Sequence, residues 1–116
     1  EADATLGKLE SSGIPPSVAG TMLIRHFQLL ERARAEIAPG RSPTDVVERL
    51  QPPIFFRRRP VIARQLGLWS KERIARALDL LDETMRQSRA KPHLAASIVS
   101  EAVLKLARAA ALAGRR

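Results

Sequence analysis

The chain has 116 residues, which is enough for one domain with a modest hydrophobic core. Its hydrophobic content of 45% beside 28% charged residues is ordinary for a globular protein and argues against disorder. The absence of cysteine excludes disulfides, thiolate catalysis and cysteine-ligated metals, and it fits a reducing compartment. Since no run of about 18 apolar residues occurs, we expect no segment that spans a membrane.

The net charge of the chain is strongly positive. Lysine and arginine number 20 against 12 acidic residues, which gives a formal charge of +8. The excess is concentrated between Arg57 and Arg76, where seven basic residues accompany a single acid, Glu72. Such a segment favours anionic partners, although an arginine-rich proteome produces the same composition without selection for binding. Charge alone therefore leaves a nucleic-acid surface and an ordinary solvated surface open.

The first two predicted helices precede a glycine- and proline-rich turn. The chain starts without methionine and in helix-like sequence, so we interpret it as the C-terminal piece of a larger protein, with residues 1–13 as a leading helix or linker. Within that stretch we expect a helix over residues 4–12. Pro15 and Pro16 suit the first turn of a second helix, which we expect to run to about residue 38.

A third, short helix is predicted after the turn PGRSP. Ser42 is its N-cap, Pro43 occupies its first position, and Asp45 follows three residues after the cap as in a capping box. The next ten residues, QPPIFFRRRP at 51–60, are expected to be extended. Prolines cannot continue a helix, and a proline also restricts the residue that precedes it.

Three more helices complete the prediction. A fourth helix has Ile62, Leu66 and Trp69 on one face, and Ser70 then caps a fifth that ends near the sequence SRAKP. The last helix is expected over about 93–113. No stretch alternates with the period of a strand, so we predict an all-α single domain, a compact bundle of five to six helices.

One core is expected to collect the apolar stripes of these helices. Their spacing of three and four residues places the stripes on single helix faces. The candidate core residues are Phe27, Leu30, Leu66, Trp69, Ile74, Leu78 and Leu81.

The last helix carries more apolar surface than one core needs. Its polar residues form a single narrow stripe, and the rest of its circumference is apolar. Either it is the central strut of the bundle, or one flank packs on its own domain and another on a partner. Under the second alternative Leu104 and Leu112 are candidate interface residues.

Residue patterns for catalysis or for cofactor binding are absent from the sequence. His26 and His93 are far apart and have no ligand-spaced partners, which argues against a zinc site. There is no phosphate-binding glycine loop, and no nucleophile stands beside an evident base. We therefore expect no enzyme activity, no cofactor and no metal in this chain.

The sequence IFFRRRP sets two phenylalanines against three arginines. In one interpretation Phe55 or Phe56 fills the core at a chain crossing while Arg57, Arg58 and Arg59 face water. In the other, one ring is still buried, but the arginines contact a neighbouring subunit or nucleic acid. Aromatic residues and arginine are enriched at protein interfaces, so all five residues are candidate interface residues.

The residues TMLIRHFQLLERARAEI, followed by PPIFFRRRPVIARQLGLWSKERIARALDLLDET, resemble the C-terminal domain of the delta subunit of the bacterial DNA polymerase III clamp loader. The resemblance covers about 21–113 and depends on the order and spacing of several features. These are the apolar pair Ile54–Phe55 with Arg58 and Arg59, the positions Leu66, Trp69, Ile74 and Ala77, and the pair Leu80–Leu81. It weakens after Leu81, so it implies no contact role for the loop 87–92.

The resemblance implies a collar domain for DNA replication. Such domains join clamp-loader subunits into a ring, and the delta subunit itself lacks ATPase activity. The implied partners are the ATPase subunits and the delta-prime subunit, in an ATP-driven loader that belongs to a DNA polymerase holoenzyme. The sliding clamp would be contacted only through a preceding N-terminal region. DNA would be contacted weakly or indirectly, and no contact with a membrane is implied. The implied location is the cytoplasm, with the nucleoid-associated replication machinery.

A second hypothesis comes from the basic segment itself. The helices on either side of Ser70 are joined by a tight turn, as in a helix-turn-helix, and the basic residues between Arg57 and Arg76 could contact DNA. Against this hypothesis, the second of these helices carries Asp79, Asp82 and Glu83, which would repel phosphate. We keep a basic DNA-binding domain as the alternative.

Overall fold

The computed structural model of the protein describes residues 13–37 and 40–114. In these residues the chain forms five α-helices and two short 3-10 turns, and no strand. The α-helices are α2 (Pro16–Glu36), α3 (Pro43–Arg49), α4 (Arg59–Leu68), α5 (Lys71–Ala90) and α6 (Ala95–Gly114), and the turns are η1 (Phe56–Arg58) and η2 (Pro92–Leu94). The predicted all-α class is confirmed. The helix predicted for 4–12 lies outside the described residues.

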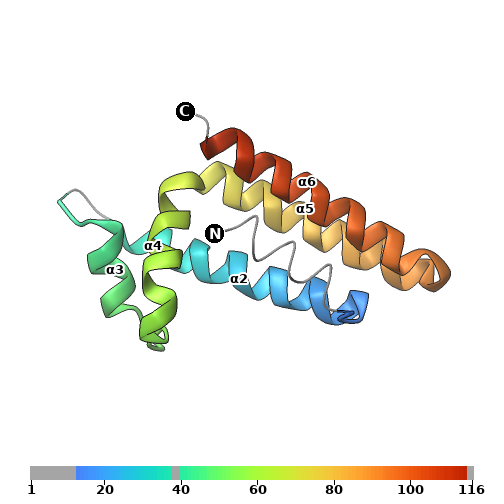
Figure 1. Cartoon of the computed structure of the whole chain (residues 1–116), viewed down its shortest axis with the longest axis horizontal. Helices are drawn as coiled ribbons and strands as arrows, with labels where there is room; N and C mark the ends of the chain where they lie inside the picture. The colour runs from blue at the N-terminus through green and yellow to red at the C-terminus, as the bar shows by residue number, and fades with distance from the viewer. Residues whose placement is uncertain (1–12, 38–39, 115–116) are drawn as a thin grey trace.

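The three long helices form one bundle, and the two shorter helices close one end of it (Figure 1). Helix α5 packs against α2 on one side and against α6 on the other, while α3 and α4 pack on each other and on α2. Helix α6 is thus an outer helix of the bundle, and α5 is the central one. Of the two alternatives for the last helix, the central strut is therefore wrong. Among the described helices, none combines the length and apolar character needed to cross a bilayer.

Two serine caps fix where helices α3 and α5 begin. The Ser42 hydroxyl accepts a hydrogen bond from the Asp45 backbone N–H at 3.2 Å, as the capping pattern predicts. The Ser70 hydroxyl accepts one from the Arg73 N–H, also at 3.2 Å. Because α4 ends at Leu68 and α5 begins at Lys71, these two helices meet at a sharp corner directly beside Trp69.

The core lies where the five described α-helices meet. Six of the seven predicted core residues are buried, with at most 3% of their surface exposed: Phe27, Leu30, Leu66, Trp69, Ile74 and Leu81. The seventh, Leu78, is only partly buried and packs against the edge of the core. The Phe27 and Trp69 rings meet edge to face, with their centroids 4.9 Å apart, which joins α2 to the corner between α4 and α5.

The segment predicted to be extended, 51–60, is extended only in its first half. The backbone turns into η1 at Phe56, and α4 already begins at Arg59, with Pro60 in its first turn. Proline stops a helix only in the interior, since the first turn of a helix uses no N–H at that position. Pro60 therefore starts α4 instead of ending an extended segment.

Candidate interaction site

The chain between α3 and α4 buries Ile54 and exposes both phenylalanines. Ile54 keeps only 6% of its surface exposed, whereas Phe55 and Phe56 keep 61% and 62%. The two rings lean on each other, with centroids 5.0 Å apart and planes tilted by 56°. The prediction that one phenylalanine fills the core is wrong, because the smaller Ile54 side chain fills that place before the backbone turns into η1.

The three arginines that follow divide into two kinds. Arg57 and Arg58 are exposed, and the Arg57 guanidinium carbon lies 5.7 Å from the centroid of the Phe56 ring, within cation–π range. Arg59 is partly buried, and its Nε donates a hydrogen bond of 3.0 Å to the Ile54 carbonyl. The prediction that all three face outward is therefore wrong for Arg59, which holds the turn. We call the exposed group Phe55, Phe56, Arg57 and Arg58 the FFRR surface.

Helix α6 presents leucine side chains to solvent. Leu104 is 46% exposed and Leu112 is 63% exposed. The opposite side of the same helix enters the core through Val99, Val103, Leu106 and Ala110. The sequence left open whether this helix is a central strut or keeps an apolar flank for a partner, and the exposed leucines agree with the second alternative. Among the described residues, the FFRR surface and α6 are the places where sequence-predicted interface residues reach the surface.

The basic segment between Arg57 and Arg76 does not form one continuous free surface. Besides Arg59, Arg73 is also bound within the fold, because its guanidinium donates to the Ala109 carbonyl at 2.5 Å and lies 5.4 Å from the Trp69 ring. Helix α5, which a helix-turn-helix would insert into the major groove, is covered on two sides by α2 and α6. This arrangement disfavours that mode of DNA binding.

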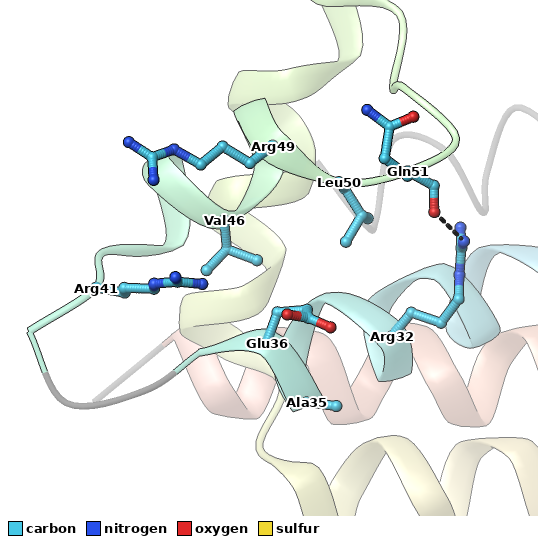
Figure 2. Close-up of a pocket in the computed structure, with 8 residues that line it drawn as sticks. All are labelled: Arg32, Ala35, Glu36, Arg41, Val46, Arg49, Leu50 and Gln51. Carbon is cyan, nitrogen blue, oxygen red and sulfur yellow. Dashed lines mark hydrogen bonds between the residues drawn. The ribbon is translucent and has the colours of Figure 1, made fainter.

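A pocket of about 530 Å³ lies between α2 and α3, and no local sequence pattern had indicated it (Figure 2). Arg32 reaches across its edge and donates to the Gln51 carbonyl at 3.1 Å, while Glu36 lies between Arg32 and Arg41. Its buried floor includes Val46 and Leu50. Three arginines, Arg32, Arg41 and Arg49, line the pocket with one acid, Glu36, so its lining is net positive, and the C-terminal ends of α2 and α3 offset part of that charge.

A buried polar group lies beside the Phe27–Trp69 contact. Gln65 on α4 is fully buried, and its amide atoms make no hydrogen bond of good geometry within the described residues. It adjoins the partly buried His26 of α2. Burial lowers the pKa of His26 below 6.5; the Gln65 amide raises that pKa, and the Arg58 charge lowers it further. Burial therefore favours the neutral form of His26 over the charged form.

The arrangement is suited to binding through side-chain contacts. In residues 13–37 and 40–114, no group of three or more His, Asp or Glu side chains gathers as metal ligands. Exposed rings beside exposed guanidinium groups instead have the composition of a protein-contact anchor. Comparison with known proteins finds no matching family model, no matching curated protein and no matching solved structure.

Proposed function

We propose that this chain is an assembly module, the collar domain of a delta-type clamp-loader subunit, which joins the ATPase subunits and the delta-prime subunit of the loader in the cytoplasm. The observation that carries the proposal is the FFRR surface. Each of these two neighbouring rings is more than half exposed, and exposing apolar surface to water is unfavourable in free energy. Beside the rings lie two charged side chains that can pair with groups on a partner.

The residues that carry the family resemblance play two different parts in this proposal. Ile54, Leu66, Ile74 and Leu81 are core residues, so the resemblance at these positions concerns the fold. Phe55 and Arg58 belong to the same pattern yet are exposed. These two positions therefore support a contact role, because nothing in the packing of the domain itself requires a ring or a guanidinium there.

Reconstitution with purified ATPase and delta-prime subunits tests the proposal. The chain should co-elute with them, and the double variant Phe55→Ser/Phe56→Ser should weaken that association by about tenfold or more, as expected for a central aromatic anchor. The matched control is Val18→Ser/Met22→Ser on α2, where both side chains are 45% exposed and lie outside the FFRR surface.

The outcomes separate the fold from the contact. All three proteins should melt alike, because the changed side chains are exposed and substitutions of this kind usually alter stability by about 0.5 kcal/mol or less. If the parent chain does not associate with the loader subunits, the proposed function is wrong. If the parent and the Phe55/Phe56 variant associate equally well, the FFRR surface is not the contact.

The alternative, a basic DNA-binding domain, retains support from one feature. Arg57, Arg58, Lys71 and Arg76 are exposed, so positive charge does reach the surface at η1 and along α5. This charge could attract phosphates, but α5 is packed against α2 and α6 and so is poorly placed to read base edges. We therefore rank assembly above DNA binding.

A further inference from the structure

Two hollows lie next to each other on the α5–α6 hairpin. One, of about 300 Å³, lies beside Trp69, and the other, of about 170 Å³, lies closer to the η2 turn. Leu80 of α5 and Lys105 of α6 line both hollows, so the two hollows are neighbours along the α5–α6 seam, and we call them together the α5–α6 groove. Figure 1 shows these helices running side by side over their whole length.

The groove is lined by apolar side chains, several of them alanines, together with charged and polar ones. Ala77, Ala102 and Ala109 line it, and short side chains let another helix approach closely. Leu112 stands at one end with 63% of its surface exposed, and Ile98 stands near the other end. A second helical layer would bury this surface.

The charges of the groove differ from one end to the other. Arg73, Arg76 and Lys105 line the hollow beside Trp69, and no acid lines it. The charged residues that line the other hollow are Glu83, Glu101 and the shared Lys105. Glu83 pairs with Arg86 at 2.7 Å, and Glu101 pairs with Lys105 at 3.3 Å. The side chains of both pairs are more than half exposed, so the pairs contribute little to stability. Arg76 makes no ion pair with any described residue.

The spacing of these residues is symmetric about the point where the hollows meet. On α5, Arg76 lies four residues before Leu80 and Glu83 lies three residues after it. On α6, Ile98 lies seven residues before Lys105 and Leu112 seven residues after it. A two-fold axis that crosses both helices at this level therefore places Arg76 on the partner's Glu83 and Leu112 on the partner's Ile98.

We propose that the groove binds a second copy of this chain in an antiparallel two-fold dimer. An antiparallel arrangement brings the end of each copy that carries Arg76 to the end of the other that carries Glu83, whereas a parallel one would set the two basic ends at the same level. The two Lys105 side chains meet near the axis, each beside the Glu101 of its own chain. The FFRR surface lies at the α3–α4 end of the molecule, so the dimer leaves it open and does not depend on the proposed function.

Single cysteines test the geometry directly, because the native chain contains none. Leu80→Cys lies at the axis and should form a disulfide-linked dimer under mild oxidation. Met22→Cys is the control, since Met22 is 45% exposed on α2 and lies outside the groove. Equal cross-linking of both variants, or none at Leu80→Cys, would overturn the proposal.

Charge exchange tests the pairing in solution. Sedimentation equilibrium of the native chain should show a monomer–dimer equilibrium. Arg76→Glu and Glu83→Arg should each raise the dissociation constant about tenfold or more, because each change occurs twice in a two-fold dimer. The double variant Arg76→Glu/Glu83→Arg should restore dimerisation to within about threefold. A native chain that stays monomeric at every concentration, or a double variant without recovery, contradicts the proposal.

Discussion

Leu81 represents the residues whose role is set by burial alone. Its side chain is 1% exposed on the central helix α5. Leu81→Ala should lower the free energy of unfolding by about 2–5 kcal/mol, because it removes buried apolar surface and leaves a cavity. Urea titration followed by circular dichroism measures the loss.

The matched control for Leu81 is Leu104→Ala on α6. Leu104 is 46% exposed, so this substitution should change the free energy of unfolding by no more than about 0.5 kcal/mol. Equal losses at Leu81 and Leu104 would mean that the α5 stripe does not face the core.

His26 gives stability a dependence on pH. Burial lowers its pKa in the folded chain below 6.5, so the unfolded chain takes up the proton first as the pH falls. The contribution of His26 is therefore fully present above pH 6.5 and is lost as the pH falls through 6.5 toward the lower pKa of the folded state. Unfolding titrations between neutral and mildly acidic pH should show this loss.

One variant isolates the His26 contribution. His26→Gln should flatten the dependence of unfolding free energy on pH over this interval. If the variant keeps the parental slope, His26 does not account for it.

The segment that contains Ile54 and Arg59 shows where residue-level prediction failed. Periodicity identified Phe27, Leu66 and Leu81 correctly, because a regular helix repeats its buried face every three to four residues. Ile54 and Arg59 lie outside any periodic stretch, and their burial depends on how closely α3 and α4 approach. Sequence reasoning assigned the core position to the larger neighbouring rings.

At the level of helices, boundaries followed from local chemistry that the sequence displays. Ser42 and Ser70 cap α3 and α5 as expected, because a cap needs only a hydroxyl and backbone N–H groups two or three residues away. The start of α4 was missed, since Pro60 fits both the end of an extended segment and the first turn of a helix. The identity of the central helix could not be predicted either, because α5 and α6 both carry broad apolar faces.

Serine-to-alanine substitution should affect stability differently at the Ser70 cap and inside a helix. Ser70→Ala should destabilise the protein by about 1 kcal/mol, because it leaves the Arg73 N–H without its acceptor at the start of α5. Ser100→Ala, inside α6, should be neutral or stabilising by up to about 0.5 kcal/mol, since alanine has the higher helix propensity. Thermal melts of the two variants compare them, and a loss of equal size at both would reject the capping role.

At the scale of the whole molecule, function depends on what the packed bundle leaves exposed. The pocket of Figure 2 and the α5–α6 groove each combine residues from two helices, so no single stretch of sequence could reveal them. The FFRR surface was recognised as a candidate contact because its composition is local. The geometry of the FFRR surface could not be predicted, because it depends on the η1 turn.

The net charge of the chain predicts the strength and the sequence preference of its binding to DNA. With a formal charge of +8 and with α5 packed between α2 and α6, binding to duplex or primed DNA should be weak and should show no sequence preference. Titration should lose most of the binding between low and physiological salt. Tight, sequence-selective binding at physiological salt would instead support the DNA-binding alternative.

The most direct test of the assembly role is a photo-cross-linking measurement at the FFRR surface. Benzoylphenylalanine, a photoreactive analogue of phenylalanine, would replace Phe56. The substituted chain would then be mixed with ATPase subunits, delta-prime subunit and primed DNA. We expect cross-links to an ATPase or delta-prime subunit, because the Phe56 ring is 62% exposed beside Arg57. Cross-links to DNA alone, or to no macromolecule while the subunits are present in excess, would contradict the account.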